Sequence, residues 1–130
     1  MQRVVGLGGV FIKARDPKKL CEWYKKHLGL NIEDWGGVVF KWKDLPQANP
    51  TGYSLFSTFK DDTKYLDPSH KPFMLNFVVN DLVQLLDQLR SEQVIMVGDM
   101  EESEYGKFAW LMDIEDNKIE LWQPPVTKQD

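Results

Sequence analysis

The sequence predicts an α+β fold in which two consecutive βαβββ modules form a single domain. Three observations carry this prediction. A short alternating strand ending on an aspartate occurs twice, the aspartates Asp16 and Asp81 are 65 positions apart, and a similar helical pattern follows each. A length of 130 residues is typical of one domain. We expect one domain over 1–130, with module one at about 7–60, a linker at 61–72, module two at about 73–124 and a tail at 125–130.

The first strand and first helix of each module are predicted by periodicity. Alternating apolar residues indicate strands with one buried face: Val10, Ile12 and Ala14 in module one, and Leu75, Phe77 and Val79 in module two. Asp16 and Asp81 are suited to cap the helices that follow, and Pro17 is tolerated in a first turn. Apolar residues at helical spacing predict the two helices: Leu20, Trp23, Tyr24 and Leu28, then Leu82, Leu85, Leu86 and Leu89.

The remaining strands follow each helix as short apolar runs. We predict them at 30–35, 38–42 and 53–59 in module one, and at 94–97, 107–112 and 118–122 in module two. Segments 44–51 and 60–72 are rich in Pro, Asp and Ser and are predicted loops. A turn cluster at 113–117 joins the last two strands into a hairpin.

The closing strand places a carboxylate beside a tryptophan. Because side chains alternate along a strand, Ile119 and Leu121 face one way while Lys118, Glu120 and Trp122 face the other. We interpret the face that carries Glu120 as the lining of a cavity, and a solvated sheet face is the alternative.

Composition and charge are those of an ordinary globular protein. The chain is 42% hydrophobic and 28% charged, with a net charge of −4 that argues against a nucleic-acid partner. It has no apolar stretch long enough to span a bilayer and no signal-peptide pattern, so we expect no membrane association and a cytoplasmic location. The one cysteine, Cys21, excludes an intrachain disulfide and is expected to be a packed thiol.

The paired modules, the aspartate-capped helices and the closing D-x-x-x-N-x-I-E-L pattern at 113–121 resemble the vicinal oxygen chelate superfamily. This superfamily includes glyoxalase I, bleomycin-resistance proteins, methylmalonyl epimerases and extradiol dioxygenases, and the resemblance covers about residues 7–124. It implies a curved sheet of the glyoxalase/bleomycin-resistance type that encloses a cleft. Relatives often carry D-P-x-G-N-x-I-E-L, so Ile114 and Asp116 are departures, and we expect Asn117 to supply a left-handed residue.

The resemblance also implies where glyoxalase-like enzymes hold a metal ion: a His, a Glu, a His and a Glu on four inward strand positions. The corresponding positions are Gly9, one near Phe56, Met74 and Glu120. One carboxylate is too few for Zn²⁺, Ni²⁺ or Fe²⁺, so we predict no metal and no cofactor. His27 is expected on the outer face of its helix and His70 in a surface loop.

The candidate ligand-binding residues are the side chains expected to face the cleft. They are Phe11, Lys13, Ser54, Phe56, Thr58, Met74, Asn76, Trp110, Glu120 and Trp122. Lys13 is expected either to pair with Glu120 or to meet the ligand. The acidic segment 99–105 either flanks the cleft mouth, favouring cationic ligands, or is a solvated loop.

Three functions are consistent with this interpretation. The first is a metal-free protein of the bleomycin-resistance type that binds a small aromatic or cationic molecule. The second is a lyase or isomerase that uses Glu120 as a general base. The third is a structural module whose cleft is filled by its own side chains. The resemblance and the exposed sheet edges further predict a homodimer.

Overall fold

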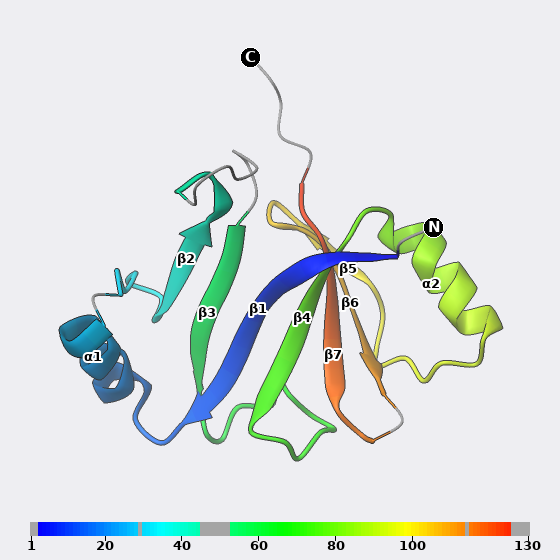
Figure 1. The fold of residues 1–130 in the computed structure, drawn as a ribbon. Coiled ribbons are helices and arrows are strands. Elements are labelled where there is room, and N and C mark those ends of the chain that lie inside the picture. The colour runs from blue at the N-terminus through cyan, green and yellow to red at the C-terminus, as the bar shows by residue number, and fades with distance from the viewer. Residues whose placement is uncertain (1–2, 29, 45–52, 114, 126–130) are drawn as a thin grey trace.

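The computed structural model describes residues 3–28, 30–44, 53–113 and 115–125. The elements in chain order are β1 (Val4–Ala14), α1 (Pro17–Leu28), β2 (Gly37–Lys41), the 3₁₀ helix η1 (Trp42–Asp44), β3 (Tyr53–Lys60), β4 (Phe73–Val79), α2 (Leu82–Ser91), β5 (Glu101–Ser103), β6 (Gly106–Met112) and β7 (Lys118–Gln123). The strands form one mixed sheet in the order β2-β3-β1-β4-β7-β6-β5, with α1 and α2 at opposite ends of it (Figure 1).

The sheet repeats one pairing scheme in each half of the chain. β1 pairs in parallel with β3, as β4 does with β7, and each of these partners then pairs antiparallel with β2 or β6. The halves join through the antiparallel pair of β1 and β4, so the modules associate edge to edge within one chain. The predicted α+β fold class with a curved sheet is confirmed, although the described part of module one has three strands rather than four.

The helices begin where the capping aspartates predict. The backbone N–H of Lys19 donates to Asp16 Oδ1 at 3.1 Å, and that of Gln84 donates to Asp81 Oδ1 at 3.1 Å. The apolar stripe of α2 then packs on the sheet in a cluster that includes Leu82 and Leu121. In the part of the chain that the structure describes, neither helix is long and apolar enough to cross a membrane.

Two predicted strands are wrong. Residues 30–35 do not pair, because Glu33 and Gly36 form a turn in which the Gly36 N–H donates to the Glu33 carbonyl at 3.0 Å. Gly36 has a φ of 90°, a conformation in which most other residues are strained. Residues 94–97 form only an isolated bridge from Met96 to Leu111, and Gly98, at φ 70°, interrupts the extended chain before β5.

Two details of the closing region also differ from prediction. Part of the acidic segment 99–105 forms β5, a short edge strand paired with β6. In the hairpin turn the left-handed residue is Asp116, at φ 63°, rather than Asn117. Asn117 instead donates its backbone N–H and its side-chain amide to the carboxylate of Asp113, which fixes the turn. Ile114 lies outside the described residues.

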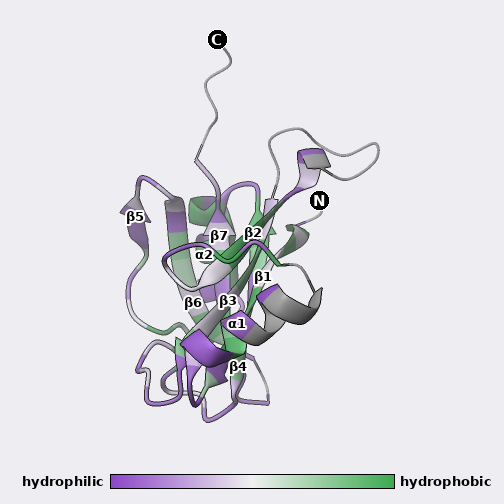
Figure 2. Cartoon of the chain, turned by 90° about the vertical axis from the view of Figure 1, so that its left-hand side faces the viewer, coloured by the Kyte–Doolittle hydropathy of each residue, from purple (hydrophilic) through white to green (hydrophobic). Residues whose placement is uncertain are grey.

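The two faces of the sheet carry different cores. Both helices cover one face, where Ala109, Leu111 and Leu121 pack below α2. In Figure 2 much of the green apolar colour lies on strands, whereas β5 and the lower loops are coloured as hydrophilic. On the opposite face Phe11, Met74 and other side chains form a second cluster, beside which the candidate site lies.

Candidate functional site

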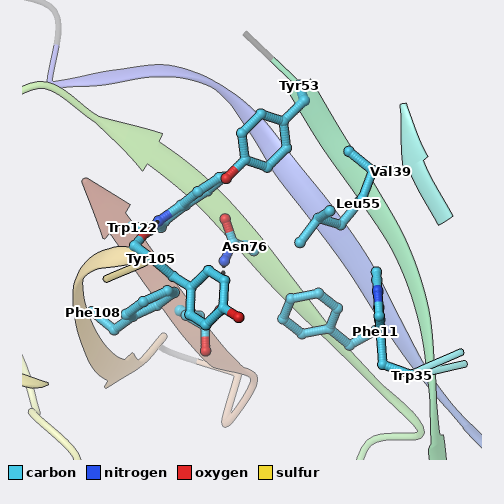
Figure 3. Close-up of a pocket in the computed structure, with 10 residues that line it drawn as sticks. Phe11, Trp35, Val39, Tyr53, Leu55, Asn76, Tyr105, Phe108 and Trp122 are labelled. Carbon is cyan, nitrogen blue, oxygen red and sulfur yellow. Dashed lines mark hydrogen bonds between the residues drawn. The ribbon is translucent and has the colours of Figure 1, made fainter. Parts of the chain in front are cut away.

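A cavity of about 450 Å³ opens on the face of the sheet away from the helices (Figure 3). This volume lies within the range of small-molecule sites. The cavity draws residues from both modules: Phe11, Trp35, Val39, Tyr53, Leu55, Asn76, Tyr105, Phe108, Glu120 and Trp122. Eight of these ten side chains are aromatic or aliphatic, and only Asn76 and Glu120 bring an amide or a carboxylate.

The aromatic walls hold one another in place. Trp122 lies 5.1 Å from Tyr53 and 6.2 Å from Phe108, measured between ring centroids, and it stacks on Phe108 at an interplanar angle of 9°. The Trp122 indole N–H donates to the carbonyl of Tyr105 at 2.7 Å. On the opposite wall Phe11 stacks on Phe59 with centroids 5.3 Å apart. These contacts limit side-chain rotation and leave a lined space between the two walls.

Glu120 lies at the floor of the cavity and is 2% exposed. Three side-chain donors converge on its carboxylate. Asn76 Nδ2 donates to Oε1 at 2.5 Å, Trp110 Nε1 donates to Oε2 at 2.8 Å, and the Tyr65 hydroxyl donates to the same Oε2. An ionised carboxylate is an acceptor only, so this all-donor shell matches the charged form of Glu120.

Burial and this shell act on the carboxylate in opposite directions. Burial raises the pKa of Glu120 above its ordinary value, while the three hydrogen bonds and the charge of Lys118 lower it, and burial has the larger effect. Burial also lowers the pKa of Lys118, whose ammonium donates to the Tyr65 carbonyl and lies 5.3 Å from the Tyr65 ring centroid. The pKa of Tyr65 is raised, first by burial and then by the Glu120 charge.

Asn76 presents an unused acceptor. Its side-chain nitrogen is engaged by Glu120, whereas its Oδ1 has no hydrogen-bond partner among the described residues, and the whole residue is 2% exposed. A Cβ on Gly8 would lie 1.7 Å from this oxygen, so the amide fits only because residue 8 is glycine. Gly8 lies within an irregularity of the pairing between β1 and β4, which brings its backbone close to Asn76.

Four of the predicted ligand-binding residues line the cavity together: Phe11, Asn76, Glu120 and Trp122. Two others lie behind this surface. Met74 is fully buried in the cluster with Phe11, and Trp110 supports Glu120 from the side of a smaller cavity of about 280 Å³. The predicted alternation of β7 is thereby correct, since Ile119 and Leu121 pack with the α2 core.

The predicted facing of β3 is wrong by one residue. Tyr53 and Leu55 line the cavity, so Ser54, Phe56 and Thr58 face the other side of the sheet. Thr58 there donates to the Gly36 carbonyl at 3.2 Å and lies 3.4 Å from the buried thiol of Cys21. The Ser54 hydroxyl accepts from the Trp42 indole at 2.9 Å. These partners below the sheet leave Ser54 and Thr58 directed away from the cavity.

Lys13 does not lie in the cavity lining, and the structure records no ion pair between it and Glu120, both of which are described residues. The three donors to Glu120 take the place that we expected Lys13 to fill. His70 is exposed in the segment between β3 and β4, as expected for a surface loop, and the side chain of His27 lies outside the described part.

Several residues of the site were not predicted from the sequence. Tyr65 comes from the linker, which has no periodicity to show that its hydroxyl reaches Glu120. Leu55 and Tyr53 were assigned to the wrong face of β3. Phe108 could have been predicted to line the cavity, because it precedes Trp110 by two positions and therefore shares its face of β6. Within the acidic segment it is Tyr105, and none of the acidic side chains, that lines the cavity of about 450 Å³.

The residues at the cavity centre do not fit a bound metal ion. The pairs Phe11 and Asn76, and Leu55 and Glu120, are each 65 positions apart, so the internal repeat places these four at equivalent inward positions. Two of the four are hydrocarbon side chains, which leaves one amide and one carboxylate. Across the described residues no group of three or more His, Cys, Asp or Glu side chains is arranged to hold a metal.

Comparison with known proteins finds similar folds among solved structures. No family model and no curated protein sequence matches the chain. Among solved structures it is similar to methylmalonyl-CoA epimerase from Mycobacterium tuberculosis, with a TM-score of 0.65 and 22% identity over 97% of this chain and 92% of that one. It is also similar to a variant of Streptomyces coelicolor methylmalonyl-CoA epimerase in complex with 2-nitronate-propionyl-CoA, with a TM-score of 0.69 and 16% identity over 95% and 99%. A glyoxalase/bleomycin resistance protein/dioxygenase superfamily member from Vibrio splendidus 12B01 matches with a TM-score of 0.59 and 10% identity over 88% and 95%.

Proposed function

We propose, from the premise that the chain has the vicinal oxygen chelate fold, that it is a metal-independent protein that binds a small, partly aromatic molecule in the cavity between its modules. This is the mode of the bleomycin-resistance type. Identities of 22% and below support the shared fold alone, so the argument for function rests on the site itself.

The observation that carries this proposal is the buried carboxylate of Glu120 at the floor of an otherwise apolar, aromatic cavity. An isolated buried charge is costly, and three donors keep this one in place. Apolar walls with a few polar groups are the usual composition of a small-molecule site, because the walls supply affinity and the polar groups fix orientation. A positive or N–H-bearing group on the ligand would meet Glu120.

The size of the cavity argues against the alternative of a filled structural module. A volume of about 450 Å³ is far larger than the voids found in well-packed cores. Figure 3 shows Phe108 and Trp122 on one side of the space and Phe11 on the other, with the ring of Tyr105 between them in this view. A flat ligand inserted between them would bury its faces against Trp122 and Phe11.

Calorimetric titration with quinoline and 2-aminoquinoline tests the proposal. Val39→Trp adds an indole to the cavity lining and is expected to abolish binding, whereas Val83→Trp adds the same group to the exposed surface of α2, where Val83 is 47% exposed, and is expected to leave binding unchanged. Equal binding by both variants, or binding of neither compound to the wild-type protein, would contradict the proposal.

A second candidate is proton abstraction by Glu120. It is favoured by one observation, the burial that raises the pKa of a carboxylate lining the cavity. Incubation with methylmalonyl-CoA in D₂O, followed by mass spectrometry, tests it. Deuterium uptake that disappears in Glu120→Gln would favour the enzyme, and the absence of uptake would leave binding as the better account.

A further inference from the structure

Two hydrogen-bond acceptors, Asn76 Oδ1 and Glu120 Oε1, stand next to each other in the cavity wall. Asn76 Oδ1 and Nδ2 share one carbon atom, and Nδ2 lies 2.5 Å from Glu120 Oε1. The two oxygens are therefore separated by a single amide group. Figure 3 shows this amide between the two walls, with its nitrogen on the side of a dashed hydrogen bond and its oxygen turned away from it.

The orientation of this amide is fixed by its partner. The Glu120 carboxylate can only accept, so the nitrogen of Asn76 must face it and the oxygen must face away. That oxygen is buried and has no partner among the described residues. Oε1 accepts one hydrogen bond there, from Asn76, and an ionised carboxylate oxygen has room for a second. Both oxygens thus have unused hydrogen-bonding capacity, and both belong to residues that line the cavity.

We propose that the ligand of this cavity carries a flat group with two adjacent N–H donors, of the amidine or 2-amino-N-heteroaromatic class, and that this group donates to Asn76 Oδ1 and Glu120 Oε1 together. The inference rests on the proposed function and specifies its ligand. A cationic form of such a group would also offset the negative charge of Glu120, and hydrogen bonds between charged groups are stronger than those between neutral groups.

The surroundings exclude the opposite class of ligand. A carboxylate or a carbonyl placed against these two oxygens would face two acceptors and a buried negative charge. The donor groups of Tyr65, Trp110 and Asn76 do not serve it, since these side chains donate to Glu120. Discrimination between N–H donors and acceptors is therefore built into the floor of the cavity.

The test compares 2-aminoquinoline with 2-methylquinoline, which keeps the size and the ring system and replaces the amino group by a methyl group. Calorimetric titration of the wild-type protein at neutral pH is expected to show about 10- to 100-fold tighter binding of the amino compound. In Glu120→Gln most of this preference is expected to disappear. Glu102→Gln removes the same charge from an exposed position on β5 outside the cavity lining, and it is expected to keep the preference.

The outcomes separate the inference from the function on which it rests. Equal binding of the two quinolines to the wild-type protein would overturn the donor-pair inference and leave a ligand-binding cavity. A preference that persists in Glu120→Gln would overturn the inference as well. Binding of neither compound would overturn both. The wild-type comparison decides the first and last cases without any variant, so a folding failure of Glu120→Gln cannot obscure them.

Discussion

Replacing Glu120 by Ala should destabilise the protein far more than replacing it by Gln. The carboxylate accepts from two buried side chains, Asn76 and Trp110, and from the hydroxyl of Tyr65, which is 40% exposed. Alanine would leave both buried donors without an acceptor, and an unsatisfied buried donor costs about 1–3 kcal/mol. We therefore expect Glu120→Ala to lower the free energy of unfolding by at least about 2 kcal/mol.

Glutamine can keep the same network. Its Oε1 can accept from Tyr65 and Trp110, and rotation of the Asn76 amide by half a turn would let Asn76 accept from the new amide nitrogen. The neutral hydrogen bonds are weaker than those to a carboxylate, but the charge no longer has to be buried. These effects offset each other, so we expect Glu120→Gln to unfold within about 1.5 kcal/mol of the wild-type protein.

The pH dependence gives an independent check. The pKa of Glu120 is raised in the folded state above its ordinary value of 4.5, so the folded protein binds more protons than the unfolded chain over the interval between the two values. The wild-type free energy of unfolding should fall, relative to Glu120→Gln, as pH rises through that interval, and then stay constant. Urea unfolding followed by circular dichroism from about pH 4 to about pH 8 measures this. A Gln variant as unstable as the Ala variant, or a difference independent of pH, would refute the reasoning.

Three further predictions concern other parts of the structure. Gly8→Ala is expected to destabilise the protein by about 1–3 kcal/mol and to weaken binding of 2-aminoquinoline, because the new Cβ would lie 1.7 Å from Asn76 Oδ1. Urea unfolding measures the stability and calorimetric titration the affinity, and wild-type values of both quantities would contradict this prediction. Elemental analysis after dialysis is expected to find no stoichiometric divalent metal, since Phe11 and Leu55 offer no ligand atom, and one tightly held Zn, Ni, Fe or Mn per chain would disprove this. Sedimentation at micromolar concentration is expected to show a homodimer, because β2 and β5 are the edges of the described sheet, and a single species near 15.2 kDa would argue against it.

Local signals determined much of the fold. Asp16 and Asp81 cap their helices as their position before an apolar helical stripe predicts, because capping depends on a few neighbouring residues. Alternation on the last strand correctly placed Glu120 opposite Ile119 and Leu121, since only one face of that strand meets a helix. The repeat of 65 positions predicted two similar modules, and in the structure the parallel pair of β1 and β3 has its counterpart in the pair of β4 and β7.

Tertiary structure alone decided which residues complete the cavity. On β3 both faces carry polar and apolar side chains, so the sequence pattern does not show whether Leu55 or Phe56 faces the cavity. In the structure Thr58 bonds to Gly36 on the helix side of the sheet, which leaves Leu55 on the cavity side. Tyr65 reaches Glu120 from a segment 55 positions away, and no local pattern encodes such a contact. The sequence by itself therefore determined the modules, their caps and the inward carboxylate. Packing of the two modules determined its donors, the free oxygen of Asn76 and the shape of the space between them, because these depend on contacts between residues distant in the chain.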